Sequence, residues 1–153
     1  MKDLGIFAAL SVIAASVSAR ECPLESDCIQ KLCKNIKVEW AYNGIPSAWN
    51  FKSWYLTANC KDNAGKKTFT QLRLDECIGN VNGEMFFSPK GDFNCDDCKI
   101  AKTDPLIMEC SCKNKGGKKR TNEINLSEGI WTYDGGIGCY QTSTHKSPGI
   151  GDF

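Results

Sequence analysis

The chain has 153 residues, and its 19 Lys and Arg against 18 Asp and Glu leave a formal net charge of +1. This balance excludes the strong overall positive field that draws proteins to nucleic acid or to anionic membranes. All ten cysteines lie beyond residue 19, and such a dense, even set predicts disulfides formed in an oxidising compartment.

Residues 1–19 have the pattern of a secretory signal peptide. Lys2 precedes an apolar run over 4–17, and Val17-Ser18-Ala19 supplies small residues before Arg20. The alternative is a membrane anchor, but the run is shorter than the ~20 residues that span a bilayer. We therefore expect a secreted, extracellular protein without a membrane span, whose remaining residues form one domain.

The segment 20–32 is an N-terminal extension that carries Cys22 and Cys28, and Ser26 or Asp27 can cap a short helical turn near its end. Beyond it, alternating polar and apolar residues predict short strands separated by turns. The strands are expected at 34–40, 54–60, 68–74, 85–87, 98–101, 106–112, 123–126 and at Tyr133.

Helical signals are limited to single turns at 75–77 and 127–129. The tail 140–153 is rich in Ser, Thr, Gly and Pro and is expected to be flexible. Many short strands joined by turns predict an all-β fold.

The chain also repeats itself. The stretch 74–83 has a second copy at 126–135, and this offset of 52 residues holds without a gap back to Cys60 and Cys112. A solenoid usually needs at least ~3 repeats to bury its faces. We therefore interpret the repeat as a duplication within one compact domain.

The motifs of the first copy are Cys-Lys-Asn-Ile-x-Val at 33–38, Leu-x-x-x-Cys at 56–60 and Leu-Asp-x-Cys-Ile-Gly-Asn-x-Asn-Gly at 74–83. The second copy has counterparts at 91–95, 100, 108–112, 124–126 and 133–135. Together they resemble the cyanovirin-N homology (CVNH) family. The resemblance covers 33–139, with repeat one over about 33–90 and repeat two over about 91–139.

The resemblance implies an elongated, pseudo-symmetric, disulfide-rich all-β domain, in which strands are exchanged between the repeats and short 3₁₀ or helical turns occur. Because family members are lectins for mannose-rich glycans, it also implies oligomannose binding. It further implies the disulfides Cys33–Cys60 and Cys95–Cys112. Six cysteines remain, and their 15 possible connectivities stay open: Cys22, Cys28, Cys77, Cys98, Cys110 and Cys139. Regular strand alternation puts Cys95 and Cys98 on opposite faces, so we expect Cys98 to have its partner elsewhere.

Two sugar sites at opposite ends are implied by the resemblance. Carried over by position, the stronger one comprises Asn80, Asn82, Asp92, Asn94, Lys113, Asn114 and Lys115. Gly79 stands where the family often has a charged residue. The weaker site comprises Lys31, Lys61, Asn63, Thr132 and Asp134, and we expect it to be silent or nearly so. In it Trp131 replaces a small residue, Thr132 replaces the asparagine and Leu32 removes a polar group.

These polar residues have a simpler interpretation, because Asn-Gly and Asp-Gly form turns for backbone reasons alone. Polar side chains on turns nevertheless suit sugars, since each hydroxyl both donates and accepts hydrogen bonds. The basic run 113–120 is either a solvated hairpin tip or a patch for polyanions such as sulfated glycans or lipid head groups. No interleaved aromatic residues support nucleic-acid binding.

The sequence shows no arrangement of residues that is typical of an enzyme active site. His145 is the only histidine and lies in the tail, and the acidic pairs 75–76 and 96–97 are sequence neighbours whose side chains point apart in a strand. We expect no enzyme and no cofactor. The spacings Cys95-x-x-Cys98 and Cys110-x-Cys112 resemble zinc-ligand pairs, but the secretory context favours disulfides over a metal.

Three further expectations remain. Asn125 begins a glycosylation sequon, Asn-Leu-Ser. The domain is a monomer or a strand-swapped dimer. The alternative to a lectin is a secreted effector or interaction module on the same scaffold without sugar binding, whose surface would be the insertion 42–53 and the basic run.

Overall fold

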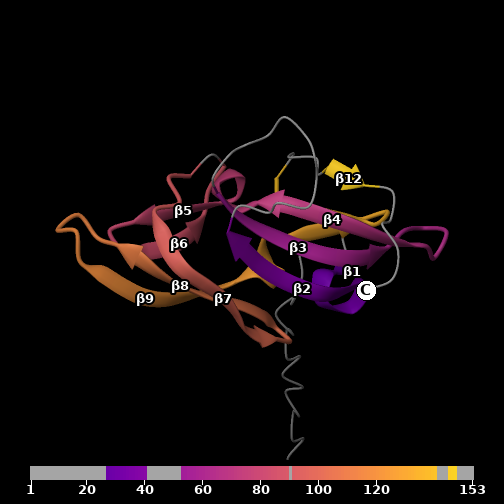
Figure 1. Ribbon diagram of the computed structural model, residues 1–153, viewed down its shortest axis with the longest axis horizontal. Coiled ribbons are helices and arrows are strands. Elements are labelled where there is room, and N and C mark those ends of the chain that lie inside the picture. The colour runs from indigo at the N-terminus through magenta and orange to yellow at the C-terminus, as the bar shows by residue number, and fades with distance from the viewer. Residues whose placement is uncertain (1–26, 41–52, 90, 141–144, 148–153) are drawn as a thin grey trace, which may run out of the picture.

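The computed structural model describes residues 27–40, 53–89, 91–140 and 145–147 (Figure 1). In these ranges the chain is all-β, apart from the one-turn helix α1 (Ile29–Leu32) and the 3₁₀ turns η1 (Leu74–Glu76) and η2 (Leu126–Glu128). The expected signal peptide, Cys22 and most of the insertion lie outside the described residues. None of the described helices is long and apolar enough to cross a membrane.

Each repeat forms one antiparallel sheet. Repeat one supplies β2 (Cys33–Trp40), β3 (Trp54–Lys61) and β4 (Lys67–Arg73), and repeat two supplies β7 (Cys95–Thr103), β8 (Leu106–Lys113) and β9 (Lys119–Asn125). β12 (His145–Ser147) pairs with β4. This part of the tail is therefore a strand, because it finds a free sheet edge that its own composition does not reveal.

Each repeat ends in a hairpin that lies on the other repeat (Figure 1). The hairpin of β5 (Ile78–Val81) and β6 (Glu84–Phe87) is tied to β9, where Met85 N donates to Asn122 Oδ1 at 3.0 Å. The hairpin of β10 (Trp131–Tyr133) and β11 (Gly136–Gly138) is tied to β4, where Ile137 N donates to Thr70 Oγ1 at 3.3 Å. The predicted strand exchange is therefore confirmed.

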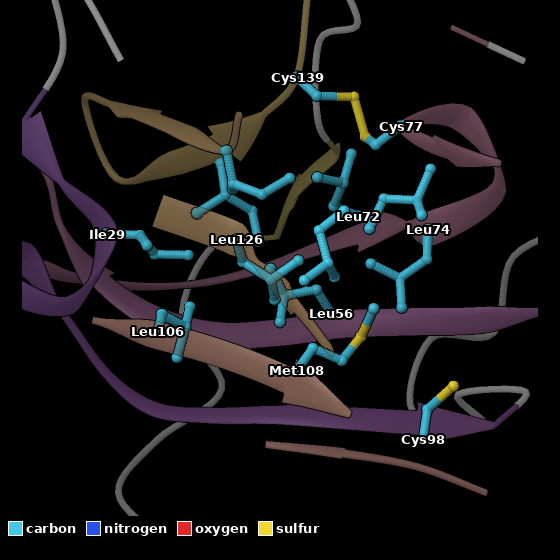
Figure 2. Close-up of a cluster of buried hydrophobic side chains, with 14 of the residues drawn as sticks. Ile29, Leu56, Leu72, Leu74, Cys77, Cys98, Leu106, Met108, Leu126 and Cys139 are labelled. Carbon is cyan, nitrogen blue, oxygen red and sulfur yellow. A yellow bond between two sulfur atoms is a disulfide. The ribbon is translucent and has the colours of Figure 1, made fainter. Parts of the chain in front are cut away.

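The core lies between these layers (Figure 2). Leu56, Leu74, Met108 and Leu126 are fully buried, and they come from both repeats. Ile29 of α1 is equally buried, and β1 (Asp27–Cys28) pairs with β10. Residues 27–32 of the extension therefore belong to the folded domain. The burial of Ile29 stabilises it, since removing apolar surface from water is worth about 25 cal/mol per Å².

Four disulfides link described residues. Cys33–Cys60 and Cys95–Cys112 join the first two strands of each repeat, which confirms the two predicted pairs. Cys98–Cys110 adds a second bridge between β7 and β8, and Cys77–Cys139 joins repeat one, directly before β5, to the end of repeat two. Cys28 is also disulfide-bonded. The four cysteines of the two zinc-like spacings are therefore consumed in bridges.

The prediction that Cys95 and Cys98 lie on opposite faces is wrong. A β-bulge interrupts the register of β7 between Asp96 and Lys99, with Asp97 at φ 52°. The extra residue resets the alternation, so both cysteines are buried and reach Cys110 and Cys112, which are two residues apart on β8. β2 has the same irregularity, with Asn35 at φ 51°.

Candidate functional site

The turn between β5 and β6 begins the site at one end of the molecule. Asn82 has φ 52° and Gly83 has φ 90°, the left-handed pair that a two-residue hairpin turn requires. A Cβ on Gly83 would lie 3.2 Å from Arg120 Cδ and 3.4 Å from Asn114 Cβ. Glycine is therefore favoured here by the backbone conformation, at a point where the turn lies close to repeat two.

Asn80 fastens this turn to two segments of repeat two. Its Nδ2 donates to Lys113 O at 2.8 Å and to Asn94 O at 3.2 Å, while its Oδ1 accepts from Gly83 N at 2.8 Å. Its backbone N also donates to Asp92 O at 3.0 Å. Both amide protons of the side chain are thus committed within the protein, so Asn80 positions the site rather than presenting donors to a ligand.

The β8–β9 loop is held in the same way. Lys115 N donates to Asn82 Oδ1 at 3.1 Å, and Lys118 N donates to Asn114 Oδ1 at 2.9 Å. The structure therefore brings all seven residues of the predicted stronger site to one place: Asn80, Asn82, Asp92, Asn94, Lys113, Asn114 and Lys115.

Two glycines allow the segment before β7 to pass this close to β5. A Cβ on Gly91 would lie 2.4 Å from Gly79 Cα, and a Cβ on Gly79 would lie 3.0 Å from the Phe86 ring. Position 79 therefore has no room for the charged side chain that is common in the family.

One positioning residue, Asn122, was not among the predicted site residues. Asn122 of β9 accepts from Met85 N and donates through Nδ2 to Gly83 O, so it holds both sides of the β5–β6 turn. Its counterpart by the repeat offset is Thr70, which holds β11 at the other end. The internal repeat could have revealed this role, because Asn122 and Thr70 occupy equivalent positions and each contacts the hairpin of the other repeat after strand exchange.

Polar groups remain for a ligand on this surface. Asn82 is exposed and its Nδ2 makes no hydrogen bond among the described residues, and Asp92, Lys113 and Lys115 are exposed. Val81, with 57% of its surface accessible, stands between the two asparagines. A turn with outward amide, carboxylate and ammonium groups beside one apolar side chain can bind a polyol through many small contacts.

The opposite end repeats the scaffold with different residues. Asn63 N donates to Asp134 Oδ1 at 2.9 Å, and Lys66 N donates to Asp62 Oδ1 at 2.7 Å. Asp134 has φ 45° and Gly135 has φ 77°, so this turn also adopts the left-handed pair. Each feature lies 52 residues from its counterpart at the first end, in the other repeat.

The anchoring asparagine is missing there. Thr132 is only 3% exposed and its hydroxyl donates to Gly136 O at 3.0 Å, inside its own hairpin. At the first end, the backbone of Asn80 bonds to Asp92 in the segment before β7. At this end, its counterpart Thr132 pairs instead with Asp27 of β1. Three residues of the weaker site are exposed: Lys31, Lys61 and Asn63. Asp134 accepts a hydrogen bond from Asn63 N, whereas Thr132 is buried.

Asn125 of the sequon has a structural role. Its Oδ1 accepts from Ser127 N at 3.1 Å and caps η2, while its Nδ2 donates to Glu128 Oε1 at 3.1 Å. Ser127 is fully buried.

Comparisons with known proteins agree with this fold. The CVNH domain model matches residues 29–138. No curated protein sequence matches the chain. Among solved structures, a complex of microvirin with mannobiose is 25% identical, with a TM-score of 0.54, and the match covers 74% of this chain and 98% of that one.

Two further structures show the same fold. A T. borchii CVNH protein is 22% identical with a TM-score of 0.56, and the match covers 74% of this chain and 100% of that one. A MoCVNH3 variant in complex with (N-GlcNAc)4 is 14% identical with a TM-score of 0.54, and the match covers 72% of this chain and 95% of that one.

Proposed function

The chain belongs to the CVNH family, and from that premise we propose that it is a carbohydrate-binding lectin with one competent site, at the β5–β6 end. The observation that carries the proposal is the bonding of Asn80. Its side chain joins the β5–β6 turn to the backbone of Asn94 and of Lys113, so three chain segments present their polar groups together.

Oligomannose is the proposed ligand class. The solved microvirin structure contains mannobiose, and a MoCVNH3 variant contains (N-GlcNAc)4. In this chain, Asn82 Nδ2 can donate to a sugar hydroxyl and the Asp92 carboxylate can accept from one, which suits adjacent hydroxyls on a hexose. The opposite end lacks this arrangement because Thr132 is buried, so we propose that it does not bind sugar.

We also propose that the protein is secreted and that residues 1–19 are removed. The disulfides support an oxidising compartment, because such bridges rarely persist in the cytosol. We propose that the protein binds glycans and does not act on them as an enzyme. The proposed partners are glycans rather than nucleic acid, and the domain acts as a monomer or a swapped dimer.

The test is a glycan array on the refolded mature protein, followed by calorimetric titration of the best neutral ligand. We expect binding of oligomannose that falls at least tenfold in Asn82→Ala, because loss of hydrogen bonds to a sugar is worth ~1.4 kcal/mol or more. The matched control is Asp134→Ala at the opposite end, which leaves affinity unchanged. Absence of binding to every glycan would refute the lectin and favour the interaction module.

A further inference from the structure

The basic run 113–120, which comprises the β8–β9 loop and the strand ends beside it, carries five cations, and they fall into two groups. Lys119 Nζ lies 3.1 Å from Asp96 Oδ2, and Arg120 Nη1 lies 3.6 Å from Glu84 Oε1. The other three have no ion pair among the described residues: Lys113, Lys115 and Lys118. Local carboxylates therefore neutralise the strand side of the loop, and the unbalanced charge gathers at its start and tip.

These three lysines are attached to the backbone that holds the candidate sugar site. Lys113 O accepts from Asn80, and Lys115 N donates to Asn82. Lys118 faces Asn114 across the loop, with Lys118 N bonded to Asn114 Oδ1 and Asn114 N bonded to Lys118 O. The backbone of Lys113 and of Lys115 is therefore fixed against the β5–β6 turn, and Lys118 lies across the same loop from Asn114.

The side chains that hold the loop backbone at this end are also uncharged. The oxygens that receive Lys115 N and Lys118 N belong to amides, Asn82 and Asn114. The homologous oxygens at the opposite end belong to carboxylates, Asp134 and Asp62. The hydrogen bonds are the same, so the amides are not needed to form the fold. The carboxylates of Asp96 and Glu84 pair with Lys119 and Arg120, and Asp92 has no ion pair with the three lysines.

Building on the proposed site for mannose-type glycans, we propose that it binds such a sugar more tightly when the sugar also carries an acidic group, a sulfate, phosphate or uronic carboxylate. The neutral part of the sugar contacts the β5–β6 turn, and the anionic group lies among the three lysines. Such complementarity chiefly provides selectivity, since each exposed ion pair is individually weak.

The experiment measures the ratio of affinities for the charged and the neutral form of one oligosaccharide, by calorimetry with the mature protein. Separate arms use the sulfated, phosphorylated and uronic forms, and they identify which group is preferred. We expect a ratio of about ten in at least one arm, which falls towards one at ~0.5 M salt, where the Debye length shrinks to a few ångströms.

Two variants test the residues. The triple change Lys113→Gln, Lys115→Gln and Lys118→Gln is expected to bring the ratio close to one. Asn82→Asp keeps the oxygen that accepts from Lys115 N and adds one negative charge, so it is expected to lower the ratio without disturbing the turn. The control substitutes Gln for three exposed lysines of repeat one, Lys37, Lys66 and Lys67, and leaves the ratio unchanged.

Equal affinity for the charged and neutral sugars would overturn this inference alone. Failure of both forms to bind would overturn the sugar site and the inference with it. A single-stranded oligonucleotide of the same charge that bound as tightly as the acidic sugar would also overturn it, because the loop would then be a general polyanion surface.

Discussion

Lys115 N donates to Asn82 Oδ1 at 3.1 Å, and the same bond recurs at the opposite end between Asn63 N and Asp134 Oδ1 at 2.9 Å. Each bond joins a hairpin of one repeat to a loop of the other. The two ends therefore share a backbone scaffold and differ in the side chains placed on it. Differences in binding between the ends can be traced to those side chains.

Asn80→Ala is expected to reduce stability as well as binding. The substitution removes one acceptor and two donor bonds and leaves the carbonyls of Asn94 and Lys113 without this partner. A partly exposed group of this kind costs on the order of 1–2 kcal/mol. Denaturant unfolding of Asn80→Ala and Asn82→Ala checks this. A smaller loss in Asn80→Ala than in Asn82→Ala would contradict the positioning role.

Removing Cys98–Cys110 is expected to cost less than removing Cys77–Cys139. The closed loops span 12 and 62 residues, which correspond to about 3 and 4 kcal/mol of chain entropy. The change Cys98→Ile with Cys110→Ala introduces the residues that repeat one has at these places, Ile36 and Ala58. Packing should thus be retained. The check is the melting temperature of this variant and of the double variant Cys77→Ala, Cys139→Ala. A larger loss in the variant without Cys98–Cys110 would refute the expectation.

Ser127→Ala is expected to destabilise the domain by about 1–3 kcal/mol. The buried hydroxyl accepts from Leu106 N at 3.0 Å and donates to Gln30 Oε1 at 3.1 Å, so it links β8 to the helix of the extension. The control is Ser111→Ala, whose exposed hydroxyl meets only Thr121 Oγ1 at 3.4 Å. Equal stability of the two variants would show that the extension contributes nothing through this contact.

Stability is expected to fall in alkaline solution through Tyr55. Burial raises the pKa of Tyr55 above its usual value near 10, Arg73 opposes the rise, and Asp75 and Glu76 add to it. The unfolded chain therefore ionises first, so this contribution is complete below about pH 10 and is lost as the pH rises through the folded-state pKa. Unfolding of the native protein and of Tyr55→Phe at pH 8 to 11 tests this, and identical pH profiles would contradict it.

The sequence by itself determined the fold, the family and two disulfides. Alternation and turn residues located the strands of the two main sheets, because side-chain direction in a strand has a period of two, but they missed the short strands β1, β5, β11 and β12. The offset between the copies at 74 and 126 revealed the duplication, and resemblance supplied the strand exchange. Matching positions also predicted seven residues that the structure brings together at one end, since turns of the same length place equivalent residues alike.

Only the tertiary structure decided what those residues do. The bulge at Asp97 reversed the expected face of Cys98, because one extra residue shifts a two-residue period. Asn80 proved to be committed to backbone carbonyls from Asn94 and Lys113, which lie far from it in sequence. Thr132 is buried and the charges of 113–120 divide into paired and unpaired groups. Burial and pairing depend on which segments the fold brings together, and a single sequence carries no direct record of them.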